Sequence, residues 1–210
     1  MEDGSGGDPR GHQAAPALRP ARRFPPEQKT MKVVFFSDAH GVANAVARLF
    51  GHADRLRADM LVFLGDALYH GPRNGVPANY DPAGTVELLN SRRGQLLAVR
   101  GNCDAEVDQL MLSYPMMAEY SELLLENVRF FLTHGHKWNE QSLPPLGAGA
   151  VFVYGHTHVP VDRMHEEGVR LFNPGSISLP KMGYPPSFGF YDGTSLEVLR
   201  LSDGEPLAFA

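Results

Sequence analysis

The chain has 210 residues, of which 43% are hydrophobic and 20% are charged, and this composition is typical of one globular domain with a single core. Its formal net charge of -5 excludes an overall basic field that would hold a nucleic-acid backbone, so we expect no nucleic-acid partner. Cys103 is the only cysteine, which excludes an intrachain disulfide and favours a reducing compartment, the cytoplasm. No apolar run reaches the roughly 18 residues of a membrane-spanning helix, so we expect no membrane partner.

Residues 1–30 differ in composition from the rest of the chain. They are rich in Gly, Pro and Arg and show no apolar periodicity. Such a segment could not bury enough apolar surface to offset the entropy of ordering. The sequence therefore predicts a disordered N-terminal extension over residues 1–30 and one folded domain over residues 31–210.

The first part of this domain alternates apolar runs with helical patterns. The apolar runs predict strands that are covered on both faces, and they occupy residues 33–36, 60–64 and 95–99. Asn44 is expected to cap a helix after the first run. The inward stripe of this helix consists of Val46, Leu49, Phe50 and Leu56. A second helix is expected to begin at Asp81-Pro82 and to end near Gly94, and the strand, helix, strand order predicts a right-handed crossover.

The second part of the domain shows the pattern of hairpins. Turns are expected at Glu126-Asn127, Gly168 and Asp192-Gly193. The predicted strands are residues 120–125, 128–132, 151–154, 160–164, 169–172, 188–191 and 196–201. A parallel half followed by an antiparallel half predicts two packed sheets with helices outside them.

Five polar clusters fall at the carboxyl ends of predicted strands. They are SDAH at 37–40, GD at 65–66, GNCD at 101–104, HGH at 134–136 and GHTH at 155–158. Ligands bind at this edge of open α/β sheets, because loops converge there. In Asp-x-His and His-x-His, side chains two residues apart point to one side of an extended backbone and can reach one centre. The pattern therefore predicts a metal site.

The donor types narrow the choice of metal and of chemistry. Oxygen ligands from Asp and Asn mixed with imidazole favour Mn²⁺ first, with Fe, Zn²⁺ or Ni²⁺ as alternatives. Asp66 is the candidate for a carboxylate that bridges two ions. Two ions bridged in this way would share a hydroxide that attacks a phosphate ester.

Each motif also has a simpler interpretation. A single His-x-His is more often a pair of hydrogen-bonded structural residues than a metal site. Asp38 and Asp66 could cap the helices that follow their strands, and capping is compatible with metal binding. Coincidence at five successive strand ends is harder to sustain, so the metal site remains the preferred interpretation.

The five blocks, in this order, resemble those of the calcineurin-like metallophosphoesterase superfamily, and the similarity spans residues 31–193. HGPRN at 70–74, RGNCD at 100–104 and NPGS at 173–176 look more closely like the bacterial phosphodiesterases of the YfcE type. The resemblance implies an α/β fold, a four-layer α/β/β/α sandwich. It also implies an enzyme that hydrolyses a small phosphodiester with two divalent ions.

The resemblance further implies how the ligands divide between the two ions. One ion would be held by Asp38, His40, Asp66 and His158. The other would be held by Asp66, Asn102, His134 and His156. The candidate catalytic residues of the third block are Asn102, Cys103 and Asp104.

Cys103 departs from the superfamily pattern. Many members place a histidine after the Asn of this block, close to the leaving group. A thiol has an ordinary pKa of about 8.5 and donates hydrogen bonds weakly, so it replaces an imidazolium poorly. We therefore expect a preference for good leaving groups, while a small packed residue is an equally simple interpretation of Cys103.

Two further residues could act on the substrate. His70 and Arg73 lie in a Gly/Pro-rich loop after Asp66, where Arg73 could clamp phosphate and His70 could donate a proton. An ordinary surface turn with solvated side chains is the alternative. His136 is expected beside the ligands rather than among them.

Other functions compete with a two-metal enzyme. Relatives of this fold serve as assembly scaffolds, as in the retromer subunit Vps29, where the metal site has partly decayed. This chain keeps all seven ligand residues, which favours retained catalysis. A nuclease would need capping domains and a basic groove, for which the ordered part leaves no room. A homo-oligomer is left open.

Overall fold

The computed structural model describes Met1 and residues 30–209. The predicted disordered extension therefore lies outside the described residues except at its two ends. The elements follow the chain in this order: β1 (Val33–Phe36), α1 (Ala43–Leu56), β2 (Met60–Phe63), α2 (Pro82–Ser91), β3 (Leu96–Ala98), α3 (Glu106–Met111), β4 (Tyr120–Leu125), β5 (Val128–Thr133), β6 (Val151–Val153), β7 (Val161–Met164), β8 (Arg170–Asn173), β9 (Ser187–Tyr191) and β10 (Leu196–Arg200).

The strands form two five-stranded sheets. The first sheet has the order β10-β9-β1-β2-β3, and the second has the order β4-β5-β6-β8-β7. In the first sheet β1, β2 and β3 pair in parallel. The strand β9 pairs antiparallel with β1 on one side and with β10 on the other. The two packed sheets confirm the predicted α/β fold class.

The expected division into a parallel half and an antiparallel half is wrong in two respects. The strands β5, β6 and β8 pair in parallel in the second sheet. The last hairpin, β9 and β10, pairs with β1 and completes the first sheet. Local turn signals identify hairpin partners, but they carry no information on the distant strand beside which a hairpin lies.

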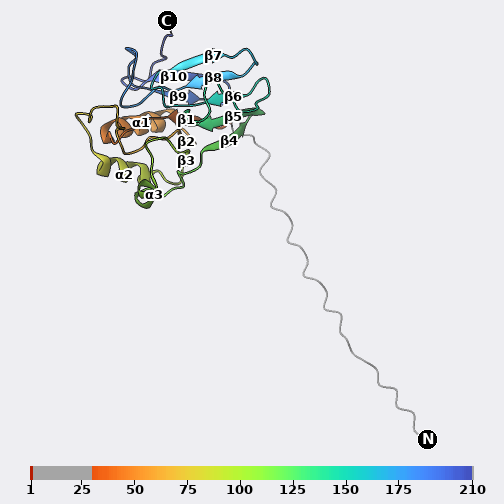
Figure 1. Ribbon diagram of the computed structural model, residues 1–210. Helices are drawn as coiled ribbons and strands as arrows, with labels where there is room; N and C mark the ends of the chain where they lie inside the picture. Colours follow the sequence, from red (N-terminus) through yellow and green to blue (C-terminus); the bar gives the residue numbers. More distant parts are fainter. Residues whose placement is uncertain (2–29, 210) are drawn as a thin grey trace.

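Three apolar clusters define the layers. One cluster lies between the sheets and contains Phe35 of β1, Phe130 of β5 and Phe172 of β8. A second cluster packs the other face of the first sheet against the helices, which Figure 1 shows on one side of the molecule. A third cluster covers the outer face of the second sheet, where Trp138, Leu143 and Leu146 pack from a segment without a helix among the described residues.

The helix boundaries differ from the prediction at one cap. Asp81 caps α2, and its side chain accepts a hydrogen bond from the Gly84 N–H, as predicted. Asn44 does not cap α1, because the helix already begins at Ala43, and Val42 holds the cap position without a side-chain hydrogen bond. Hydrophobic burial fixes this end instead, since Val42 is 7% exposed against the core.

The strand ends bring distant loops together at one edge. Asp38 follows β1 and its N–H donates to Gly65 O after β2, while Gly155 after β6 donates to His134 O after β5. The loop after β8 joins them, because the Ile177 N–H donates to Ser37 O. All five predicted polar clusters therefore lie near this edge. Within the described part of the chain, no helix is long and apolar enough to cross a membrane.

Candidate metal centre

Five of the predicted ligands hold their backbone in the left-handed region. Their φ values are positive, and they are Asp38, His40, Asp66, His156 and His158. This conformation is rare for residues other than Gly and is commonest where function maintains it. The strand-to-loop turns thus place these residues in a conformation that L-residues adopt at a cost.

Two glycines allow the loops to approach each other. A Cβ at Gly101 would overlap the carboxylate and backbone nitrogen of Asp66. A Cβ at Gly155 would overlap the side chain of Ser37. The Gly that precedes Asn102 and the Gly that precedes His156 are therefore needed for packing between loops.

Three histidines are oriented by backbone carbonyls. The Nδ1 atoms of His40, His134 and His158 lie 2.7, 2.7 and 2.5 Å from the carbonyl oxygens of Tyr69, Leu64 and Leu179. A carbonyl oxygen only accepts, so each Nδ1 carries the proton and donates it. In its neutral form each of these imidazoles then carries its lone pair on Nε2, directed into the site, which is the tautomer that a metal-binding histidine needs.

These nitrogens face one another and a buried carboxylate. His40 Nε2 lies 3.3 Å from His158 Nε2. The Oδ1 atom of Asp38 lies 3.2 Å from His158 Nε2, yet it is buried and accepts no hydrogen bond of good geometry. Two facing lone pairs beside a carboxylate repel unless a proton or a cation lies between them. Asp38, His40 and His158 can hold a metal ion, because one donor atom of each lies within 4.8 Å of the others.

Asp66 lies between two such groups. Its Oδ2 atom is 3.8 Å from His40 Nε2 and 3.4 Å from His134 Nε2. One group of closely spaced donors joins Asp66 to Asp38 and His134, and another joins it to His40 and Cys103. The other oxygen, Oδ1, accepts the Cys103 N–H at 2.8 Å, which leaves Oδ2 facing the site.

Asp104 holds the loop of Asp66 from behind. Its Oδ2 atom accepts the N–H groups of Asp66 and Gly101, and its Oδ1 atom accepts that of Ala67. Burial raises the pKa of this carboxyl, while the backbone hydrogen bonds oppose the rise. The side chain is 2% exposed. Asp104 therefore positions the loops after β2 and β3 and does not reach the pocket as a catalytic residue.

The electrostatics of the site favour charged carboxylates. Burial opposes ionisation of Asp38, but the imidazoles of His158 and His40 hold its pKa well below the usual range. Burial also opposes protonation of His134, but Asp66 and Asp38 raise its pKa to about 9. A concentration of negative charge that attracts protons in this way also attracts metal cations.

Asn102 and His156, the two remaining predicted metal ligands, lie at the edge of the group of close donor atoms. Asn102 Oδ1 lies 3.0 Å from His134 Nε2. The ring of His156 lies 5.1 Å from that of His134. The backbone N–H of His156 donates to Asp38 Oδ2 at 3.2 Å. His156 belongs to none of the groups with donor atoms within 4.8 Å, although it lines the same pocket.

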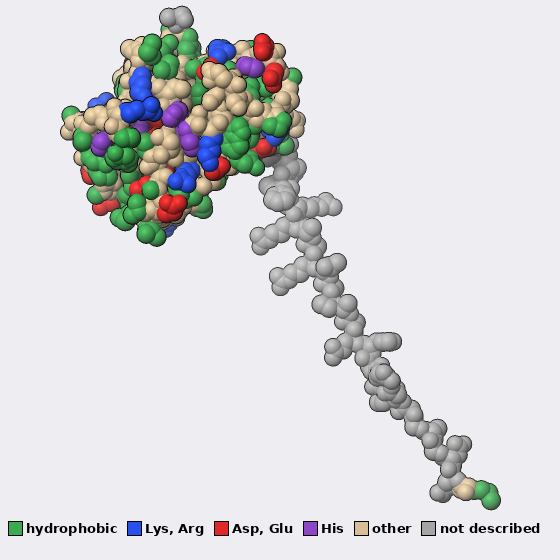
Figure 2. Space-filling view, in the orientation of Figure 1, with side chains coloured by type: hydrophobic (Ala, Val, Ile, Leu, Met, Phe, Trp, Pro, Cys, Tyr) green, Lys and Arg blue, Asp and Glu red, His purple; other side chains and the backbone are tan. Residues whose placement is uncertain are grey.

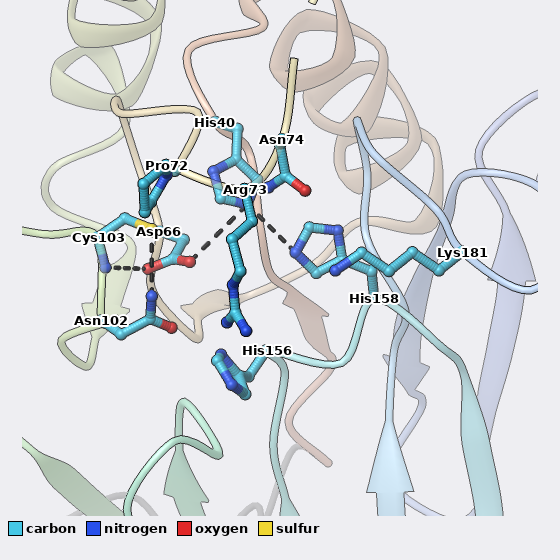
Figure 3. Close-up of a pocket in the computed structure, with 11 residues that line it drawn as sticks. His40, Asp66, Pro72, Arg73, Asn74, Asn102, Cys103, His156, His158 and Lys181 are labelled. Carbon is cyan, nitrogen blue, oxygen red and sulfur yellow. Dashed lines mark hydrogen bonds and ion pairs between the residues drawn. The ribbon is translucent and has the colours of Figure 1, made fainter. Parts of the chain in front are cut away.

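The loop after Asp66 brings Arg73, but not His70, to the site. Arg73 lines a small cavity of about 50 Å³ together with His40, Asp66, Asn102 and His156 (Figure 3). His70 instead turns into its own loop. Its Nδ1 lies 3.3 Å from Asn74 O, and its ring packs between Tyr69 and Tyr80. The prediction that His70 serves as a proton donor is therefore not supported by its position.

The sequence did not predict the contacts that Lys181, Ser176 and Ser178 make at the site. Lys181 lines the pocket from the opposite side to Cys103 (Figure 3). Ser176 and Ser178 both donate their hydroxyls to Asp38 O, at 2.9 and 2.7 Å. The hydroxyl contacts and Lys181 had no signal in the spacing.

Residues 31–195 match the calcineurin-like phosphoesterase superfamily domain. The chain belongs to the calcineurin-like phosphoesterase superfamily. Its predicted class, a hydrolase that acts on phosphate esters, is thereby confirmed. The chain is 47% identical over 178 residues to phosphodiesterase YfcE of Escherichia coli strain K12, across 85% of this chain and 96% of that protein.

Solved structures agree with this place in the calcineurin-like phosphoesterase superfamily. The E. coli phosphoesterase YfcE superposes with a TM-score of 0.82 at 47% identity, over 85% of this chain and 97% of that one. Vacuolar protein sorting 29 from Cryptosporidium parvum matches with a TM-score of 0.55 at 20% identity, over 84% of this chain and 94% of that one. At that identity the second similarity shows a shared fold alone.

The residues at the strand ends fit the divalent ions that calcineurin-like phosphoesterases imply. The buried, unpartnered oxygen of Asp38 and the facing nitrogens of His40 and His158 are the donors that such ions take. Oxygen and imidazole donors are mixed, as expected for a transition metal. The metal-binding groups are therefore compatible with the predicted cofactor class.

Proposed function

We propose that the chain is a phosphodiesterase that hydrolyses small phosphodiesters with two divalent metal ions. The observation that carries this proposal is the pair of lone-pair nitrogens of His40 and His158, which face each other at 3.3 Å beside the buried Asp38 carboxylate. The preference for diesters is supported by the 47% identity to the E. coli phosphodiesterase YfcE. The scaffold alternative has no comparable support in the site.

The proposed ligand set divides at Asp66. The first ion would be held by Asp38, His40, Asp66 and His158, and the second by Asp66, Asn102, His134 and His156. Asp66 is suited to the shared position because the same Oδ2 atom faces His40 on one side and His134 on the other. Because Oδ1 is held by the Cys103 N–H, the carboxylate cannot rotate freely.

Two bound ions would lower the pKa of a hydrolytic water and balance the charge that develops on the phosphate oxygens. The mixed oxygen and imidazole donors favour Mn²⁺, with Fe, Zn²⁺ or Ni²⁺ as alternatives. The carbonyls of Tyr69, Leu64 and Leu179 hold the imidazoles in place, so that the donors need not reorganise when a substrate enters.

Two cationic side chains are placed to hold the phosphate. Arg73 and Lys181 line the same pocket as His156 and His158 (Figure 3). A guanidinium can donate two parallel hydrogen bonds to phosphate oxygens, whereas an ammonium acts as a point charge. We assign to Arg73 the orientation of the phosphate and to Lys181 a contribution to its charge balance.

Cys103 limits the choice of leaving group. Burial, followed by the charge of Asp66, raises the pKa of this thiol to about 12, so it stays protonated at neutral pH. A neutral thiol donates hydrogen bonds weakly. The Asn102 amide donates to its Sγ at 3.2 Å. The leaving group must therefore depart with little help from Cys103, which favours esters of acidic alcohols and phenols.

Asp66→Asn tests the proposed function. The variant keeps the shape of the side chain but removes the shared negative charge. We expect it to lower the turnover of bis-p-nitrophenyl phosphate by at least about 100-fold, because loss of a metal ligand or its support costs that order of activity. Metal-depleted protein would be assayed before and after addition of Mn²⁺, by release of p-nitrophenolate.

Asp54→Asn is the matched control. Asp54 is an exposed carboxylate of α1 that pairs with Arg92 away from the pocket. This control should retain wild-type turnover and wild-type dependence on Mn²⁺. Equal turnover in wild type and Asp66→Asn, or turnover that survives removal of all metal, would contradict the proposed function.

A further inference from the structure

A second cavity lies beside the metal centre and is not used by the chemistry described above. It has a volume of about 280 Å³ and is lined by Arg100, Gly101, Asn102, Glu119, His136 and Lys137. Arg100 follows β3, Glu119 precedes β4, and His136 and Lys137 follow β5. The cavity therefore sits where the two sheets meet, on elements that hold its walls in fixed positions.

The walls of this cavity are tied together by backbone contacts. The Arg100 N–H donates to Ala118 O at 2.7 Å, which joins the end of β3 to the residue before Glu119. The Thr133 hydroxyl donates to Glu119 O at 3.2 Å, which joins the end of β5 to the same segment. Such a pocket is formed before any ligand arrives.

The charged groups of the cavity leave it with a positive excess. Lys137 pairs with Glu119, and both side chains are about half exposed. The Nε–H of Arg100 donates to the backbone oxygen of Asp104 at 3.1 Å. None of the described carboxylates forms an ion pair with the Arg100 guanidinium. Two cations therefore face one carboxylate, in a chain whose overall charge is -5.

The second cavity borders the metal centre at Asn102. This residue lines both cavities, and its Oδ1 lies 3.0 Å from His134 Nε2. His136 lines the second cavity 5.5 Å from the ring of His134, and its buried Nδ1 has no hydrogen-bond partner. Figure 2 shows histidine side chains on the surface with Lys and Arg side chains on both sides of them. A substrate whose phosphate lies at the metals can extend past Asn102 into this second cavity.

We propose that this second cavity binds an anionic group, a carboxylate or a second phosphate, on an arm of the substrate. The inference rests on the proposed function, because it takes the phosphate at the metal centre as its origin. Arg100 and Lys137 attract the second anion, and Glu119 limits the attraction. The preferred substrate is therefore a phosphodiester that carries a further negative charge on one arm, rather than one with two neutral arms.

Binding of simple phosphates to the Mn²⁺-loaded protein tests the proposal. Isothermal titration calorimetry would compare ω-carboxyalkyl phosphates and ω-phosphoalkyl phosphates, with one to three methylene groups, against alkyl phosphates of equal length. In wild type we expect the best-fitting anionic arm to lower Kd about fivefold relative to the alkyl arm, a factor typical of one partly exposed charge contact. The two series distinguish a carboxylate from a phosphate as the second anion.

Lys137→Gln and Glu119→Gln form a matched pair of variants. Both remove the same ion pair, but they change the charge of the cavity in opposite directions. Lys137→Gln should reduce the fivefold preference to about twofold or less, whereas Glu119→Gln should increase it. Arg48→Gln, which removes an exposed cation of α1 outside this cavity, should leave the preference unchanged.

The outcomes separate this inference from the proposed function. Equal Kd values for anionic and alkyl arms at every length, or equal effects of Lys137→Gln and Glu119→Gln, would overturn the inference. Hydrolysis of ethyl p-nitrophenyl phosphate, which has a neutral arm, is measured in parallel. Its absence would contradict the proposed function and leave the binding comparison as an independent result on the second cavity.

Discussion

At the scale of single residues, the site depends on backbone conformations that side chains other than Gly adopt at a cost. Asp38 and His40 both have positive φ values, and each such residue costs on the order of 1–3 kcal/mol. The strain persists because neighbouring loops hold the backbone. The Asp38 N–H donates to Gly65 O and the His40 N–H donates to Asp66 O, both at 3.0 Å. The backbone positions of these two proposed ligands are therefore fixed by hydrogen bonds within the protein.

The replacement of Cys103 tests the account of the leaving group. Cys103→His places an imidazole beside Asn102, where it can donate a proton that the thiol donates poorly. We expect kcat to rise at least about tenfold for a methyl or ethyl leaving group and to change much less for p-nitrophenolate. The measurement is kcat for a series of diesters with leaving groups of increasing pKa. A plot of log kcat against leaving-group pKa should have a shallower slope for Cys103→His than for wild type.

Cys103→Ala is the control for this series. It removes the thiol without adding a proton donor, so the slope should stay as steep as in wild type. A uniform rise for all leaving groups in Cys103→His would show that the histidine acts on binding or on the metals instead of on the departing oxygen.

At the scale of elements, the ends of helices and strands place the functional loops. The end of α1 is a left-handed cap at Arg57, with φ 56°, whose N–H donates to the Ala53 and Asp54 carbonyls. This cap turns the chain into β2, which carries Asp66 at its end. A left-handed position at a helix end is usually occupied by Gly. The exposed Arg57 is thus a local weakness in an element that supports the site.

Arg57→Gly should stabilise the protein. Gly adopts the left-handed conformation without the Cβ penalty, so we expect a gain of about 0.5–1 kcal/mol in the free energy of unfolding. Arg48→Gly, in the exposed interior of the same helix, should cost about 1 kcal/mol instead. Urea denaturation of the metal-free variants measures both. A loss of stability in Arg57→Gly would contradict the assigned conformation.

At the scale of the whole molecule, the sequence predicts the local elements and the ligand positions better than their assembly. The apolar runs located β1 and β2 to within one residue, and the Asp81-Pro82 signal located the start of α2. The short helix α3 and the pairing of β9 with β1 were missed, because the first has no strong periodicity and the second joins residues far apart in sequence.

The same limit applies to the site. Motif spacing brought Asp38, His40, Asp66, His134 and His158 into one prediction, and the structure places their donor atoms close together. Lys181 and the second cavity could not be predicted, since they depend on how the two sheets meet. The position of the His70 side chain could not be predicted either, because the sequence of a loop does not specify where its side chains point. Cytoplasmic location and oligomeric state stay predictions.

The central claim is that two metal ions share Asp66. Anomalous diffraction at the manganese absorption edge, from crystals grown with Mn²⁺, tests it most directly. We expect two peaks about 3.5–4 Å apart, one near His40 and His158 and the other near His134 and Asn102, with the Asp66 carboxylate between them. A single peak, or two peaks that Asp66 does not join, would contradict it.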